Sequence, residues 1–261
     1  MGQIMSRFNH LEFSEHFEEQ SSSTPAIKDG QYYLAQARQA FESGRFEEAL
    51  RAYAKVLEFD PQCAAAWTGQ VKMLIELREN HEAKLWADKA LELFPNEAEL
   101  LAAKAVALAR SGDLQAALTF SDAAVEAQGN TPYVWLARAD VLLARAEKRA
   151  EFCFGKALTL AAQDWVVHWL ACRIYCYYQK FSRGLQLAQK ALEMDATKAV
   201  VWLQFGRCQL ALGLPQVAAT SFAHARELDP LCQADSSEIS DLAQSGLWRR
   251  LRGWWRQAFG S

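Results

Sequence analysis

Small and large apolar residues recur along the chain at a nearly constant spacing. One column of small residues comprises Ala49, Ala83, Ala117, Ala150, Gly184 and Ala218, which lie 34, 34, 33, 34 and 34 residues apart. A second, mostly small column comprises Val56, Ala90, Ala124, Ala157, Ala191 and Ala225. A column of large residues comprises Tyr33, Trp67, Leu101, Trp135, His168 and Trp202. Self-similarity at a fixed period of this length predicts an architecture of repeated units.

The columns predict that each unit is a pair of helices joined by a short turn. Small residues at a fixed phase allow two helices to cross closely, and large residues fill the space between one unit and the next. Gly44, Gly112 and Gly213 stand where the two helices of a unit must turn, because glycine tolerates the backbone conformations of tight turns. A proline, which cannot continue a helix, ends units one, two and six. The pattern therefore predicts twelve antiparallel helices over residues 30–232 and no β-sheet there.

Two segments carry a specific resemblance. FESGRFEEALRAYAKVLEFDP (41–61) and WLQFGRCQLALGLPQVAATSFAHARELDP (202–230) resemble the tetratricopeptide repeat family. The resemblance covers about residues 30–232 and implies an all-α fold, a right-handed α-solenoid of about six helix-turn-helix units. We expect an N-terminal segment over 1–29, the repeats over 30–232, and a C-terminal amphipathic helix within 233–261.

Units four and five depart from the repeat. Unit four loses one residue within LLARAEKRA, and unit five has Gly184 where alanine is usual and lacks the terminal proline. The sequence therefore predicts an irregularity in packing at this point of the array.

In the family that the chain resembles, the first helix of each unit lines a concave groove that binds a protein or peptide partner. Carried onto this sequence, the groove residues are Arg38, Lys72, Tyr133, Leu136, Asp140, Trp169, Arg173, Tyr177, Leu203 and Arg207. The resemblance implies an apolar floor toward the C-terminal half, edged by Arg173 and Arg207. Aromatic and arginine side chains are frequent anchors at interfaces. For Trp169 a second interpretation stays open, in which it is a core residue between units five and six.

The C-terminal stretch LWRRLRGWWRQAF (247–259) is strongly amphipathic when drawn as a helix. Its apolar face is rich in tryptophan and leucine, and arginines fill the opposite face. The residues concerned are Trp248, Arg249, Arg250, Leu251, Arg252, Trp254, Trp255 and Arg256. Two interpretations stay open: a helix that caps the last repeat, or a helix that lies on an anionic membrane surface. At the other end, Phe8, Leu11 and Phe13 predict a docking segment, with simple disorder as the alternative.

Composition and motifs narrow the class of function. The chain has a net charge of −3, and its basic residues form no stripe along the predicted groove, which disfavours a nucleic-acid binder. The five histidines are scattered, and neither HExxH nor a phosphate-binding loop occurs. The six cysteines contain no CxxC pair. Cys172 and Cys176 share a helix face but have no matched partners for a metal. We therefore predict no catalytic residue, cofactor, metal site or small-molecule substrate.

The leading hypothesis is a cytoplasmic adaptor or scaffold that binds a protein partner in its groove and is not an enzyme. The chain has no apolar run of membrane-spanning length, and its first thirty residues lack the apolar stretch of a signal peptide. The alternative hypothesis is a peripheral membrane-associated assembly factor that is recruited by the C-terminal amphipathic helix.

Overall fold

The computed structural model describes residues 28–127, 129–232, 239–240 and 244. Within this part the chain is all α-helical, with twelve helices before residue 233 and no strand, as predicted. The helices are α1 (Gly30–Glu42), α2 (Phe46–Phe59), α3 (Ala64–Glu76), α4 (Asn80–Leu93), α5 (Ala98–Arg110), α6 (Leu114–Glu126), α7 (Pro132–Ala144), α8 (Ala150–Leu160), α9 (Trp165–Tyr177), α10 (Phe181–Met194), α11 (Ala199–Ala211) and α12 (Pro215–Leu228). The predictions for residues 1–20 and 247–259 concern residues outside this part. No helix in the described ranges has both the length and the apolar character needed to cross a membrane.

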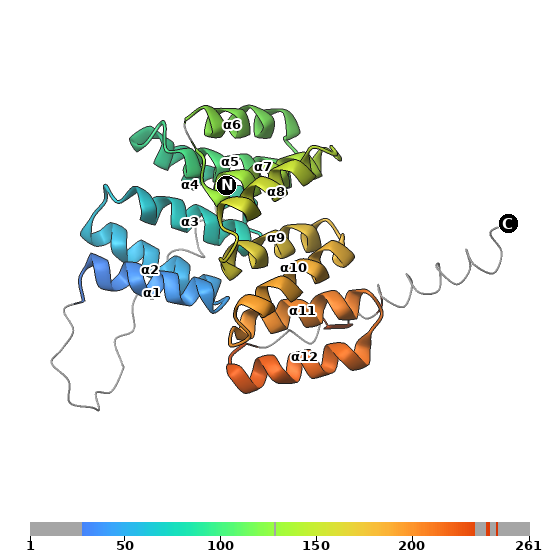
Figure 1. Cartoon of the computed structure of the whole chain (residues 1–261). Helices are drawn as coiled ribbons and strands as arrows, with labels where there is room; N and C mark the ends of the chain where they lie inside the picture. The colour runs from blue at the N-terminus through green and yellow to red at the C-terminus, as the bar shows by residue number, and fades with distance from the viewer. Residues whose placement is uncertain (1–27, 128, 233–238, 241–243, 245–261) are drawn as a thin grey trace.

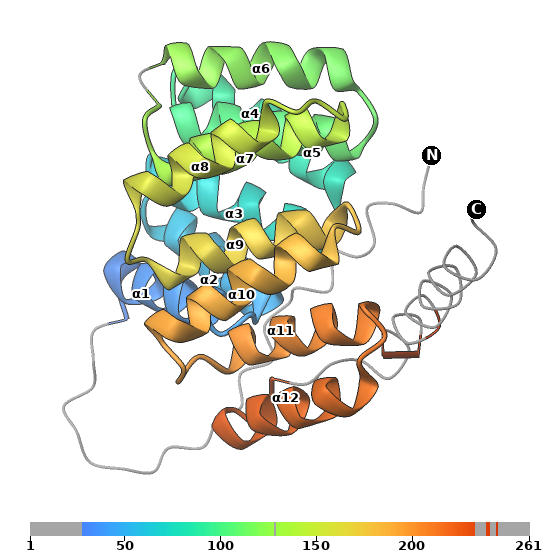
Figure 2. The same ribbon diagram turned by 45° about the vertical axis from the view of Figure 1, so that its right-hand side comes forward.

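Consecutive helices pair into six units, α1–α2 through α11–α12, and the units stack into a solenoid (Figure 1). The first helices of units two to six are buried on most sides, whereas each second helix buries one narrow face. The first helices therefore form the inner layer of the coil and the second helices the outer layer. Figures 1 and 2 both place α9 close to α3 and α7 within this inner layer.

The columns of small residues lie where the helices cross, as the sequence predicts. Ala49, Ala83, Ala117 and Ala218 are completely buried, and so are Ala90 and Ala157 in the second column. A larger side chain at these positions would push two packed helices apart, and overpacking of this kind costs about 1–3 kcal/mol. These contacts explain why alanine recurs at a fixed phase through the array.

The turn inside each unit requires one residue with a left-handed backbone. Gly44, Gly112 and Gly213 have φ values of 73°, 94° and 80°, which confirms their predicted role. At the equivalent positions of units two, four and five, the structure has Arg78, Ala146 and Gln179, with φ values of 65°, 56° and 57°. The array therefore holds this turn geometry even where the residue is not glycine, and there the turn stores backbone strain.

The predicted irregularity in unit four lies at the start of α8. This helix begins at Ala150, which is equivalent to Ala49, whereas α2 begins three residues before Ala49 at Phe46. The missing residue falls between the left-handed Ala146 and the first turn of α8, so that helix has 11 residues in place of 13 or 14. As a result, α8 packs less extensively against α9 than other second helices pack against the unit that follows.

Candidate functional site

The inner face of the solenoid, where the sequence predicts a groove, is largely filled by the protein's own helix α9. Side chains of α9 contact units one to four: Trp169 packs on unit one, Arg173 binds Glu76 of α3, and Tyr178, just after α9, binds Asp140 of α7. The N-terminal units therefore close around α9 and approach the last two units of the chain (Figure 2).

Trp169 is the centre of this closure. Its ring lies 5.6 Å from that of Phe41 and is stacked at 6.1 Å on that of Phe46, which flank the turn of unit one. Its side chain is completely buried. Gly44 in the same turn approaches unit six so closely that a β-carbon would lie 2.8 Å from Cγ2 of Val200. Of the two interpretations of Trp169, the structure therefore favours a core residue, although its main contacts extend to unit one.

Three other predicted groove residues are also buried. Leu136 packs in the cluster that α7 and α8 share with α9, and Leu203 packs with Trp169 and Val200. Asp140 is fully inaccessible. The expectation that these side chains form an open apolar floor is wrong, because α9 already covers that floor.

Asp140 receives two strong hydrogen bonds from neighbouring units. Arg110 Nη2 of α5 lies 2.6 Å from Oδ2, and the Tyr178 hydroxyl donates to Oδ1 at 2.6 Å. Burial disfavours the charged guanidinium, but Asp140 and Glu76 outweigh burial and raise the pKa of Arg110. Burial and the Asp140 carboxylate raise the pKa of Tyr178. The side chains of Arg110, Asp140 and Tyr178 thus join units three, four and five.

A second polar group links units two to four on the inner face. Lys72 Nζ lies 2.6 Å from Glu99 Oε2 and 3.7 Å from the centre of the Tyr133 ring. Burial opposes the negative charge of Glu99, but Lys72 lowers the pKa of that carboxyl. Lys72, Tyr133 and Glu99 are half-buried, so this group is reachable from solvent.

Arg173 and Tyr177 form the third polar group, along α9. Arg173 Nε donates to Glu76 Oε2 at 2.7 Å, and its guanidinium lies over the rings of Phe46 and Trp169. The Arg110 guanidinium lies 4.3 Å from the centre of the Tyr177 ring. Both Arg173 and Tyr177 keep part of their surface exposed.

The two remaining predicted residues lie at the ends of the inner layer, where Arg38 is exposed on α1 and Arg207 is half-buried on α11. Four residues that bind the predicted groove residues from within the chain were not predicted from the sequence: Glu76, Glu99, Arg110 and Tyr178. One signal was present, because Glu76 and Arg110 stand at equivalent positions of units two and three with opposite charges. Their partners could not be identified, since Glu76 pairs with a unit three places further along the array.

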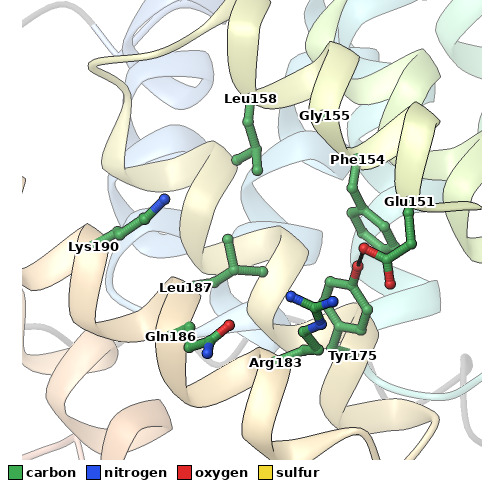
Figure 3. A pocket seen from close by; sticks show the side chains of 9 residues that line it. All are labelled: Glu151, Phe154, Gly155, Leu158, Tyr175, Arg183, Gln186, Leu187 and Lys190. Atoms are coloured by element: carbon green, nitrogen blue, oxygen red, sulfur yellow. Dashed lines mark hydrogen bonds between the residues drawn. The ribbon is translucent and has the colours of Figure 1, made fainter.

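An outer cleft marks the loosened boundary of units four and five. It has a volume of about 230 Å³ and lies between α8 and α10, above Tyr175 of α9 (Figure 3). The Tyr175 ring stacks on Phe154 at 4.2 Å, and its hydroxyl donates to Glu151 at 3.0 Å. The rim is charged, with Arg183 and Lys190 on α10.

Comparisons with known proteins agree with the fold. Residues 30–63 match the tetratricopeptide repeat family. The structure is similar to that of TTC0263, a tetratricopeptide repeat protein of Thermus thermophilus, with a TM-score of 0.54 and 20% identity over 69% of this chain and 99% of that one. A tetratricopeptide repeat protein from Parabacteroides merdae gives a TM-score of 0.53 and 18% identity over 85% of this chain and 86% of that one.

The APC/C hetero-tetramer Cut9–Hcn1 provides a third similar structure. The match has a TM-score of 0.52 and 17% identity, and it covers 85% of this chain but only 44% of that chain. Comparison of the sequence with curated proteins gave no match. At these identities the structural likeness shows the fold, and the matched unit with its in-phase copies shows the repeat. The chain thus has the fold of tetratricopeptide repeat proteins, and its residues 30–63 match that family's repeat.

Proposed function

We propose that the chain is a non-catalytic adaptor or scaffold that binds a protein or peptide partner along the exposed part of its inner face. The observation that supports this proposal is the convergence of partly exposed aromatic and cationic side chains from several units. Lys72 and Tyr133 approach from units two and four, and Arg173 and Tyr177 come from unit five. Large aromatic and arginine side chains that keep some exposure are frequent anchors of interfaces.

The charges on this face indicate what kind of partner fits. Lys72 is paired with Glu99 and Arg173 with Glu76 within the chain, so these cations are largely neutralised before any partner binds. A partner carboxylate could replace one of these internal acids, while its apolar side chains contact Tyr133 and Tyr177. We therefore expect recognition by shape and aromatic contact more than by long-range charge attraction.

A photoreactive phenylalanine derivative at position 177 tests this proposal. We expect it to form a covalent adduct with a partner protein in cells that make the chain. The matched control places the same group at Phe152, which is 67% exposed on the outer helix α8. Adduct formation at position 177 should decrease when Lys72 and Arg173 are changed to alanine. Equal labelling at both positions, or labelling that the alanine changes leave intact, would show that the partner binds elsewhere.

The second candidate function is recruitment to a membrane surface by residues 247–259. Its support is the sequence composition alone: four arginines on one face of the helix and three tryptophans on the other. Each basic residue near an anionic surface contributes about 1 kcal/mol, and salt screens this attraction. In this view the repeats would hold a protein partner at the membrane.

Co-sedimentation with lipid vesicles tests the second candidate. We expect the full chain to bind vesicles that contain phosphatidylserine reversibly, and to release them at high salt. Changing Arg249, Arg250, Arg252 and Arg256 to glutamine should abolish binding. The control is a neutral phosphatidylcholine vesicle. No binding to the anionic vesicle, together with a lower melting temperature on deletion of 246–261, would instead support the cap interpretation.

A further inference from the structure

Three cysteine side chains from two helices meet in the inner layer of units five and six. Cys172 and Cys176 lie one turn apart on α9, and Cys208 lies on α11. The Sγ–Sγ distances are 3.9 Å between Cys172 and Cys176, 3.8 Å between Cys172 and Cys208, and 3.2 Å between Cys176 and Cys208. Cys172 and Cys208 are fully buried, and Cys176 is half-buried. The sequence analysis found no third ligand because Cys208 lies in the next unit.

Packing alone does not account for the three cysteines. The positions equivalent to Cys176 hold Phe41, Ile75, Ala109, Leu143 and Leu210, and those equivalent to Cys208 hold Gln39, Met73, Ala107, Val141 and Ile174. Those positions thus take side chains of very different size in the other units. Only in units five and six do these positions hold cysteines, and there the sulfur atoms lie next to one another.

Gly184 of α10 leaves the space that the sulfur atoms occupy. The other five units have alanine in this column. A β-carbon at residue 184 would lie 2.8 Å from Sγ of Cys176, closer than packed atoms tolerate, and 3.3 Å from Sγ of Cys208, a tight contact. The departure of unit five from the repeat is therefore matched to the cysteine cluster.

The three thiols differ in how easily they lose a proton. Hydrogen bonds from Cys172 and Cys208 lower the pKa of Cys176 below the usual cysteine value, with smaller contributions from Gln204 and Arg173. Burial raises the pKa of Cys172.

We propose that Cys172, Cys176 and Cys208 form a three-thiolate site for a single soft cation of the Cu(I) or Zn(II) class. Sulfur ligands about 2.3 Å from a trigonal or tetrahedral ion lie about 3.8–4.0 Å apart, as two of the three pairs already do. The third pair, at 3.2 Å, must open by about 0.6 Å for an ion to bind all three sulfur atoms. Soft thiolate ligands select such cations over hard ones. Because the ion binds thiolates, binding releases to solvent whatever protons the three thiols carry.

Titration of the reduced, full-length chain tests the proposal, with Zn²⁺ and Cu⁺ as separate probes in competition with a coloured chelator. We expect one ion per chain for at least one probe, together with a rise in melting temperature. Bound ion should also protect the half-buried Cys176 from alkylation, as read by mass spectrometry, and leave the half-buried Cys63 reactive. The alkylation arm uses the unaltered chain, so it does not depend on how any variant folds.

Substitutions assign the ligands. Cys176→Ala and Cys208→Ala adopt the residue that unit three has at these positions, and each should weaken binding by more than the roughly 10- to 100-fold typical of outer-shell changes. Gly184→Ala should weaken binding without removing a sulfur atom. The matched control is Cys153→Ala, which removes a buried thiol from α8 and should bind the ion normally.

The proposal is overturned if neither probe binds, or if binding survives in both Cys176→Ala and Cys208→Ala. It is also overturned if the reduced chain binds no ion but mild air oxidation links Cys176 to Cys208. That last result would assign the cluster to a redox pair.

Discussion

Changing Trp169 to alanine is expected to destabilise the protein by about 3–5 kcal/mol, the usual cost of removing a large buried aromatic side chain. The indole is completely buried between α9 and the turn of unit one, where Phe41 and Phe46 pack on it. Its removal leaves a cavity at the point where the coil closes. Urea denaturation followed by far-ultraviolet circular dichroism measures the effect.

Two controls separate the closure from general core damage. Trp169→Phe keeps an aromatic ring against Phe46 and should cost much less than alanine. Gly44→Ala and Gly112→Ala both force a left-handed alanine, at about 1–2 kcal/mol each. Only at Gly44 does the added methyl group meet Val200, whereas at Gly112 it meets open space. Equal costs at the two glycines, or a Trp169→Ala chain as stable as the wild type, would mean that unit one does not close on units five and six in solution.

Changing Asp140 to alanine is expected to lower the free energy of unfolding by about 3–5 kcal/mol, because it leaves the Arg110 guanidinium buried without its carboxylate. The side chains of this pair are 7% and 1% exposed, so water cannot replace the lost partner. The Tyr178 hydroxyl loses its acceptor at the same time. Chemical denaturation of the single variant gives the measurement.

The control for this prediction is a pair whose carboxylate is open to water. Asp88 pairs with Lys104 at 2.6 Å, but 44% of the Asp88 side chain is exposed, so Asp88→Ala should cost less than about 1 kcal/mol. The double variant Arg110→Met with Asp140→Leu should recover most of the stability, since it removes both charges together. Similar small losses for Asp140→Ala and Asp88→Ala would contradict the buried network and return Asp140 to the set of accessible groove residues.

The repeated part of the fold could be predicted because its determinants lie within one unit or between neighbours. Ala49 and its equivalents mark helix crossings, and Gly44, Gly112 and Gly213 mark turns, wherever the rest of the chain lies. A turn was predicted in every unit, but the left-handed residues Arg78, Ala146 and Gln179 were not identified, because these residue types do not themselves favour that backbone conformation.

The candidate site was predicted less well, because it depends on how far the solenoid curls. The resemblance implied an open groove, whereas in the structure Arg173 and Tyr177 keep only part of their surface exposed. Unit five follows the shortened helix α8, and in unit five Trp169 packs on Phe46 and Arg173 binds Glu76, two contacts that no single repeat predicts. The same holds for Cys208, since only the packing of α11 on α9 shows that it completes a cluster.

The contact between Phe46 and Trp169 also changes how the whole array should come apart. In an open solenoid each repeat touches only its neighbours, so stability adds along the chain and end repeats can fray independently. Here the first repeat shares its core with the fifth and sixth, so losing either end exposes apolar surface at the other. The ends therefore stabilise each other, and unfolding becomes more nearly all-or-none than in an open array. Folding also carries the entropy of closing a loop across most of the chain, and such long-range contacts make folding slower than in a helical repeat with local contacts only.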